Sequence, residues 1–164
     1  MFATVAPMKF RFPSLCAAIL CAGTAQAYEG QSHGVLEGAA QLDSPLHTQI
    51  GAQYMRDLTD TWRLSGGLTH STEVGPRTGA RVGVAYVLDV LRYVPWVGAS
   101  AGADLVGGHG KMQAVVGLSG GLDVSWSRDW ATGVFYKQEW NLTEIDGATS
   151  REALGLRAMF TWGH

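Results

Sequence analysis

The sequence predicts an all-β protein, an eight-stranded antiparallel up-and-down transmembrane β-barrel. Three observations predict this fold. Apolar and polar residues alternate in runs of about ten, as they do in a strand whose two faces meet different surroundings. The ionisable residues of these runs share a face with glycine and serine. The connections between runs alternate in length, as the two ends of a membrane barrel do.

The N-terminal 27 residues have the form of a secretory signal peptide. Lys9 and Arg11 precede an apolar stretch over residues 12–23, and residues 25–27 (Ala-Gln-Ala) form a small-x-small cleavage site. We therefore expect residues 1–27 to be removed on export and residues 28–164 to form one outer-membrane barrel domain. An uncleaved anchor is the alternative, but the apolar stretch falls short of the roughly 20 residues that span a bilayer. Translation starts at Met1 or at Met8.

The composition narrows the class of protein further. Both cysteines, Cys16 and Cys21, lie in the signal, so packing and backbone pairing must hold the exported domain together without disulfides. The chain has 12 Lys and Arg against 14 Asp and Glu, and no basic run suggests a nucleic-acid partner. No stretch after the signal approaches 18 consecutive apolar residues, so a transmembrane helix is not expected.

Eight alternating runs are expected to be strands, and their lengths suit tilted membrane strands. They cover residues 34–42, 47–56, 62–71, 80–89, 94–105, 112–126, 131–141 and 151–162. If the chain starts in the periplasm, the inner turns are 57–61, 90–93 and 127–130, and the outer loops are 43–46, 72–79, 106–111 and 142–150. Three of the four outer loops are the longer connections, and an even number of strands returns the C-terminus to the periplasm.

The two faces of each strand indicate which side meets lipid. When the ionisable residue is assigned to the interior, the opposite face is apolar, for example Val82 and Val84 on one strand and Leu118 on another. The expected lumen charges are Glu37, Arg63, Arg81, Asp104, Asp123, Lys137, Glu139 and Arg157. The exceptions on the outer face are Arg56, His70 and Glu152 at strand ends, and the uncharged Gln138. A soluble β-sandwich or lipocalin-like barrel would instead bury its apolar face, and a core of glycine and charge would offer it little apolar area.

Four acidic and four basic lumen residues are expected to pair and fill the interior, with the strand-terminal Asp89 and Arg151 left out of this count. Buried charges require partners, whereas an aqueous channel would more naturally carry a surplus of one sign. Arg81 should pair with Asp104, and Glu37 with Arg157 across the seam between the first and last strands. Each pair should lie within about 6 Å, the reach of a direct or water-bridged contact.

Aromatic residues gather at the strand ends expected to face the periplasm, as in the interfacial belts of membrane proteins. They are Tyr54, Trp62, Tyr93, Trp126, Trp130, Phe160 and Trp162. On the external side, Trp140 is the one clear marker.

The final strand alternates Leu154, Leu156, Ala158, Phe160 and Trp162 with smaller or polar residues. With the inverted faces, this makes residues 28–164 resemble the small eight-stranded outer-membrane barrels of Gram-negative bacteria, of the OmpA-transmembrane-domain and OmpX type. The resemblance implies outer-membrane lipid and lipopolysaccharide as partners. It also implies that the terminal aromatic signal is read by the barrel-assembly machinery, although Gly163 and His164 follow the aromatic residue here.

For function, the sequence favours a structural or interaction barrel with a filled lumen. The alternatives are a narrow passive pore and a lipid-A-modifying enzyme. His70, Ser71 and Glu73 lie where such an enzyme would act, but neighbouring strand residues face opposite sides, so no catalytic residue is predicted. His33, His109 and His164 are isolated in the sequence, so we expect no metal or cofactor. Asp43, Asp57 and Asp60 are interpreted as turn formers. The oligomeric state stays open.

Overall fold

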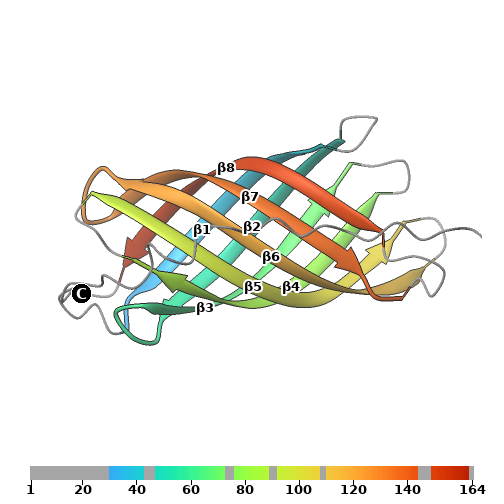
Figure 1. The fold of residues 1–164 in the computed structure, drawn as a ribbon, viewed down its shortest axis with the longest axis horizontal. Helices are drawn as coiled ribbons and strands as arrows, with labels where there is room; N and C mark the ends of the chain where they lie inside the picture. Colours follow the sequence, from blue (N-terminus) through green and yellow to red (C-terminus); the bar gives the residue numbers. More distant parts are fainter. Residues whose placement is uncertain are drawn as a thin grey trace, which may run out of the picture.

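The structure is a computed structural model of the 164-residue chain and describes residues 30–42, 47–72, 76–88, 92–107, 110–143 and 149–162. Its strands are β1 (Ser32–Gln41), β2 (His47–Asp57), β3 (Trp62–Ser71), β4 (Arg77–Val87), β5 (Tyr93–Val106), β6 (Lys111–Ser125), β7 (Trp130–Asn141) and β8 (Ser150–Trp162). They form one closed barrel in chain order, every neighbouring pair antiparallel, with β8 closing on β1. Figure 1 shows the strong tilt of the strands that closure of a small barrel requires.

All eight strands expected from the alternation are present, with ends that differ by at most three residues from the prediction. The largest difference is the start of β4 at Arg77, because Arg77 and Gly79 still pair with β3 and β5. The described residues contain no helix long and apolar enough to cross a membrane. The expected signal, residues 1–27, lies outside the described residues.

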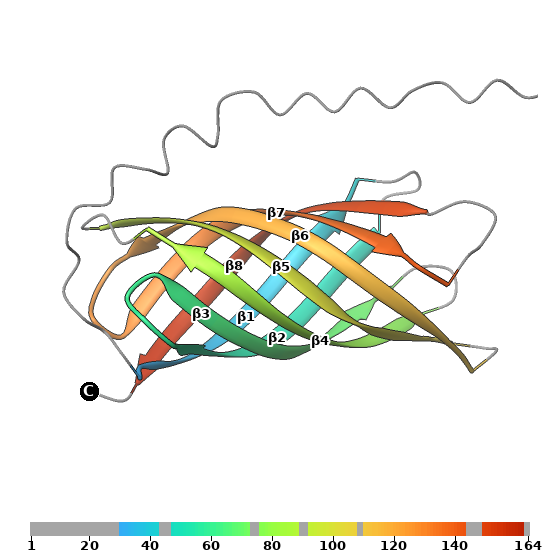
Figure 2. The same cartoon turned by 60° about the horizontal axis from the view of Figure 1, so that its bottom comes forward.

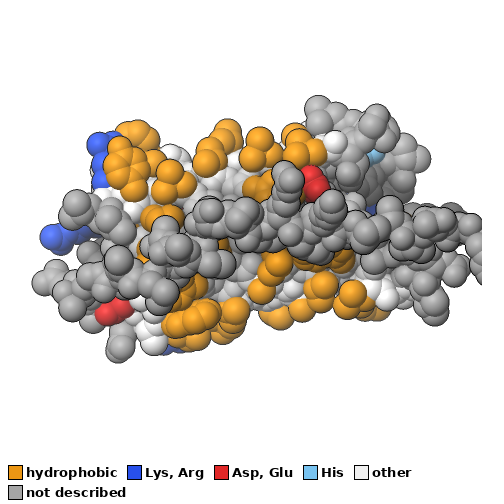
Figure 3. Space-filling view, viewed as in Figure 1, with side chains coloured by type: hydrophobic (Ala, Val, Ile, Leu, Met, Phe, Trp, Pro, Cys, Tyr) orange, Lys and Arg blue, Asp and Glu red, His pale blue; other side chains and the backbone are white. Residues whose placement is uncertain are grey.

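The distribution of side chains between the two faces confirms the inverted pattern. Leu118 and Leu156 are 50% and 68% exposed on the outside, while Asp123 and Arg157 are 1% and 4% exposed inside. Hydrophobic side chains line the visible wall in Figure 3, and basic groups gather near one end of the barrel. This arrangement is opposite to that of a water-soluble barrel, and it suits a wall that faces lipid.

The lumen also holds apolar side chains, although the sequence predicted an interior of glycine, serine and paired charges. One cluster consists of Val35, Met55, Ala131 and Met159, and a second of Val87, Val94, Trp96 and Phe135. These residues share the inward parity of the charges, so they fill the volume between charged pairs. The interior of the barrel is therefore a mixed core that combines dispersion contacts with ion pairs.

The seam between β1 and β8 is covered on the outside by aromatic rings. We call the barrel end that carries Ser32 and Trp162 the terminus end, and the opposite end the loop end; Figure 2 shows β8 beside β1. The Trp162 ring lies over Gly34, where an added Cβ would come within 3.1 Å of it. Trp162 also contacts Tyr54 across β1, with ring centroids 6.1 Å apart. The glycine thus lets an aromatic ring lie flat across the closing strand pair.

Candidate functional site in the lumen

A chain of ion pairs crosses the loop-end half of the lumen. Arg81 Nη2 lies 2.6 Å from Asp104 Oδ1, and Arg81 Nε donates a hydrogen bond to Glu139 Oε1 at 3.1 Å. The second oxygen of Asp104 accepts a hydrogen bond from Arg151 Nη2 at 2.9 Å. Lys137 Nζ lies 3.8 Å from Glu139 Oε1. We call Arg81, Asp104, Lys137, Glu139 and Arg151 the loop-end network.

This network spans the lumen because its members come from opposite walls. Arg81 on β4 bonds to Glu139 on β7, and Asp104 on β5 bonds to Arg151 on β8, in a barrel closed in chain order. Glycines make the crossing possible: Gly79 is the register partner of Asp104, and a Cβ there would overlap the carboxylate. Each buried charge has a partner of opposite sign, which is the condition for keeping ions inside a barrel this narrow.

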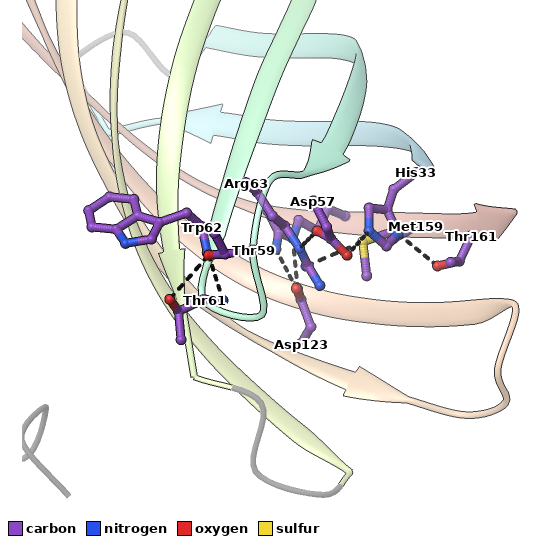
Figure 4. A network of polar contacts seen from close by, with 10 residues as sticks. His33, Asp57, Thr59, Thr61, Trp62, Arg63, Asp123, Met159 and Thr161 are labelled. Atoms are coloured by element: carbon purple, nitrogen blue, oxygen red, sulfur yellow. Dashed lines mark hydrogen bonds and ion pairs between the residues drawn. The ribbon is translucent and has the colours of Figure 1, made fainter. Parts of the chain in front are cut away.

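A second group of polar contacts occupies the terminus end (Figure 4). His33 Nε2 lies 3.0 Å from Asp57 Oδ2, and His33 Nδ1 lies 2.8 Å from Thr161 Oγ1. Arg63 Nε donates to the other Asp57 oxygen at 2.6 Å, and Arg63 Nη1 reaches the sulfur of Met159. His33, Asp57 and Thr161 are all buried. We call His33, Asp57, Arg63 and Thr161 the terminus-end network.

Beside the terminus-end network, Arg157 and Asp123 form a buried bidentate pair (Figure 4). Arg157 Nε donates to Asp123 Oδ1 at 2.7 Å, and Nη2 donates to Oδ2. The pair reaches from β8 to β6 over Gly133 of β7, whose added Cβ would overlap the Asp123 carboxylate. The guanidinium also lies 3.9 Å from the centre of the Trp96 ring, a cation–π contact in a site shielded from water.

The predicted pairs have different outcomes. Arg81 and Asp104 pair as expected. Glu37 and Arg157 are register partners across the seam, as expected, but among the described side chains no ion pair joins them. The reason is geometric: the Arg157 guanidinium is held by Asp123 and stacked on Trp96. Glu37 instead lines the central cavity.

The central cavity measures about 50 Å³ and lies among the charged groups. Its wall includes Glu37, Arg63 and Lys137, together with Ser65, Ser100 and Ser119. At roughly 10–15 Å³ for each water centre, the cavity has room for about four water molecules. The cavity lies between side chains of the terminus-end network, such as Arg63, and of the loop-end network, such as Arg81 and Lys137.

The eight lumen residues expected from the sequence all lie on inward-facing positions, and the structure joins seven of them in ion pairs. Sequence reasoning missed three further members. Arg151, a strand-terminal residue in the sequence, is buried against Asp104. Asp57, expected to form a turn, and His33, isolated in the sequence, contact each other inside the barrel. The alternation of the strands could have identified them, because His33 lies on the same strand face as Glu37, and Arg151 on the same face as Arg157.

The residues considered for catalysis and metal binding do not come together. His70 is exposed on the outer face, where its Nδ1 lies 3.0 Å from Thr78 Oγ1, while Ser71 is buried in the lumen. The two therefore lie on opposite sides of the wall, as the alternation predicts, and Glu73 lies outside the described residues. Among the residues that the structure describes, no three His, Cys, Asp or Glu side chains gather as a metal site would need. His109, His164 and Asp43 fall outside this part of the chain.

The alternating residues of the final strand point outward. Leu154, Leu156, Phe160 and Trp162 are exposed, and Ala158 is half-buried on the same face. Phe160 stacks on Trp162 with ring centroids 5.9 Å apart and lies 5.2 Å from the ring of Trp130. The residues of the expected assembly signal thus form an exposed group of apolar and aromatic side chains on the outer face of β8, with the aromatic rings at the terminus end.

Comparison with known proteins supports the fold. No protein-family model matches the chain, and no characterised protein matches it by sequence. Among solved structures, the N-terminal β-barrel domain of Pseudomonas aeruginosa OprF matches with a TM-score of 0.70 at 12% identity, covering 84% of this chain and 100% of that one. Neisserial surface protein A matches with a TM-score of 0.60 at 12% identity, covering 84% and 98%.

A transmembrane β-barrel designed de novo matches to a similar degree, with a TM-score of 0.60 at 13% identity over 82% of this chain and 97% of the design. These likenesses extend over nearly the whole length of each structure. The chain therefore has the fold of the small eight-stranded transmembrane β-barrels, with the closed all-antiparallel architecture expected from its sequence.

Proposed function

We propose that this chain is an outer-membrane barrel that acts as a structural or interaction protein and whose lumen is closed to solutes. Its outward apolar wall and its likeness to membrane barrels support a place in the outer membrane. Its terminus end then faces the periplasm, and residues 1–27 are removed as the signal for export.

The observation that carries the proposal is the crossing of the lumen by paired charges. The loop-end network and the Arg157–Asp123 pair join different walls of the barrel. Opening a path would leave charges without partners in a narrow interior, and breaking a buried pair costs about 3–5 kcal/mol. The apolar clusters close further parts of the cross-section. A filled interior of this kind favours a barrel that works through its wall and its external loops.

Single-channel recording in planar bilayers tests the closed lumen. The purified mature barrel should give no steady conductance, with a general porin in the same bilayer as the positive control. An Arg81→Ser/Glu139→Ser variant removes one cation and one anion and therefore keeps the net charge while it widens the loop-end half. Steady ohmic steps from the unmodified protein would contradict the proposal and favour a narrow pore.

The proposal also holds that the barrel does not modify lipids. In support, His70 and Ser71 lie on opposite sides of the wall, whereas a histidine activates a hydroxyl only within hydrogen-bond reach. Mass spectrometry of lipid A from cells with and without expression should give identical spectra. Loss or gain of an acyl chain on expression would show enzymatic activity.

Outer-membrane lipid, lipopolysaccharide and the barrel-assembly machinery are the proposed partners. Membrane fractionation, followed by gel mobility before and after boiling, tests this placement because folded barrels migrate differently from unfolded ones. N-terminal sequencing of the mature protein should begin at Tyr28. A protein recovered in the soluble fraction would contradict the proposed location.

A further inference from the structure

Four buried side-chain atoms near the loop end have no hydrogen-bond partner among the described residues. They are Gln41 Oε1, Ser71 Oγ, Asn141 Nδ2 and Arg151 Nε. Their residues lie on β1, β3, β7 and β8, and each residue is between 1% and 9% exposed. Atoms buried this deeply are out of contact with both bulk water and lipid headgroups. We call Gln41, Ser71, Asn141 and Arg151 the mouth ring.

The mouth ring lies at one level of the lumen. Followed from β1 through β8 and around the barrel, the register falls toward the terminus end and returns to β1 at Gln31 after starting at Gln41. For a tilt of about 40°, this is a fall of about 3 Å per strand, while each residue along a strand contributes about 2.5 Å of height. On this scale the four side chains start within about 4 Å of one another along the barrel axis.

Two members of the ring are held in place by their other polar atoms. Asn141 Oδ1 accepts a hydrogen bond from the Thr143 backbone N–H at 3.0 Å, and Arg151 Nη2 donates to Asp104 Oδ2 at 2.9 Å. Each of the two therefore keeps a donor group at a fixed place. Buried polar groups without partners are rare in folded proteins and call for a specific explanation, such as a bound ligand. Four of them at one level of the lumen indicate a site for a polar ligand.

The charge around the mouth ring favours an anion as this ligand. The loop-end network, to which Arg151 belongs, carries three cations against two carboxylates. Glu37, which lines the central cavity, lies further along β1 toward the terminus end, about 10 Å below Gln41. Opposite charges attract strongly where little water screens them. A small anion would therefore balance the surplus of positive charge at this end of the lumen.

The hydrogen-bonding groups of the ring distinguish between small anions. Asn141 and Arg151 offer donors and the Ser71 hydroxyl can donate or accept, but Gln41 Oε1 can only accept. Chloride and sulfate bring no proton to this oxygen, whereas phosphate at neutral pH keeps at least one P–OH group. The ring faces the lumen, which membrane lipids do not enter, so the matching species is the free ion.

We propose that the mouth ring binds inorganic phosphate, which enters the lumen from the loop end. Arg151 Nε and Asn141 Nδ2 donate to phosphate oxygens, and the P–OH group donates to Gln41 Oε1. The long side chains of Gln41 and Arg151 shift to admit the ion, since their unpartnered atoms are closed to solvent in this arrangement. The site goes beyond the proposed structural role, and it requires no open path through the lumen.

Water is the competing occupant of the ring. A water molecule accepts hydrogen bonds from donors and donates to acceptors, so it can match these four groups as well. It leaves the surplus positive charge of the loop-end network unbalanced, however, and the ion does not. Charge complementarity therefore favours phosphate.

Isothermal titration calorimetry of the mature barrel in dodecyl maltoside tests the proposal. Inorganic phosphate and sulfate are titrated separately at neutral pH, with sodium chloride holding the ionic strength constant. We expect saturable binding of one phosphate per barrel, and an affinity for sulfate at least about tenfold weaker, because sulfate leaves Gln41 Oε1 without a donor. Heats of dilution alone would overturn the proposal and identify water as the occupant. Equal affinities for the two ions would overturn it too.

The double variant Gln41→Met/Ser71→Ala tests the location. It should weaken phosphate binding at least about tenfold. Its free energy of unfolding without phosphate should not fall, because the variant removes buried groups that have no partners. Heat-dependent gel mobility verifies that it folds. Ser119→Ala is the matched control, since it removes a lumen hydroxyl at the central cavity and should keep the full affinity for phosphate.

Phosphate binding that survives the double substitution, or that Ser119→Ala weakens equally, would refute the assignment to the mouth ring. None of these results depends on conductance, so the phosphate site can fail while the closed lumen stands.

Discussion

Replacing Arg157 with methionine isolates the contribution of one buried ion pair. Methionine keeps much of the side-chain volume but removes both hydrogen bonds to Asp123, a residue that is 1% exposed. The carboxylate is then left inside the barrel without its counter-ion, which costs about 3–5 kcal/mol. Since each 1.4 kcal/mol is tenfold, the folding equilibrium should fall by roughly two to three and a half orders of magnitude. Loss of the cation–π contact between Arg157 and Trp96 should lower the stability further.

A double-mutant cycle separates the pair from the packing. In Arg157→Met/Asp123→Asn the stranded charge is gone, so we expect the double variant to regain about 1–3 kcal/mol over Arg157→Met alone. Urea unfolding and refolding titrations in phosphatidylcholine vesicles, followed by tryptophan fluorescence, measure all four proteins. If Arg157→Met costs less than about 1 kcal/mol, or if the two single effects simply add, the reasoning about buried pairs in this lumen is refuted.

Three further substitutions, one of them with a matched control, test other parts of the structure in the same titration. Gly133→Ala places a Cβ against the Asp123 carboxylate, and the overpacking should lower the free energy of unfolding by about 1–3 kcal/mol. An unchanged free energy of unfolding would mean that the backbone of β7 shifts to accommodate the methyl group. Leu118→Arg puts a charge on the lipid face and should cost about 2–4 kcal/mol, whereas Ser119→Ala on the lumen side should change little; similar effects would contradict the assignment of faces. His33→Leu removes the link between a buried carboxylate and a buried hydroxyl and should cost about 1–3 kcal/mol, and full stability would show that water replaces the imidazole.

The fold was predictable because alternation fixes the side on which every strand residue lies. Once Asp123 is placed inside, Leu118 and Leu122 must be outside, and the register of each hairpin follows from its turn. Strand ends were less certain: the strand expected from residue 80 begins at Arg77, and the one expected from residue 151 begins at Ser150. The alternation of residues within one strand carries no information on how far the neighbouring strand extends.

Contacts across the lumen could not be predicted in the same way. Arg157 has Glu37 as its register partner on β1, yet it bonds to Asp123 on β6. The partner of Arg157 depends on which strands its long side chain can reach across the lumen. Gly133 has no side chain that would block the path to Asp123, and the ring of Trp96 packs against the guanidinium. These are properties of the closed cylinder, and neither a single strand nor a single hairpin contains them.

The strand that closes the barrel carries the cations that neutralise acids on strands earlier in the chain. Arg151 of β8 bonds to Asp104 of β5, and Arg157 of β8 bonds to Asp123 of β6. Without β8, Asp104 would keep Arg81 as a partner, but the buried Asp123 carboxylate would lose both of its hydrogen bonds. Closure of the barrel thus completes the neutralisation of its interior, and a sheet of seven strands would carry an unpaired carboxylate that a lipid environment disfavours.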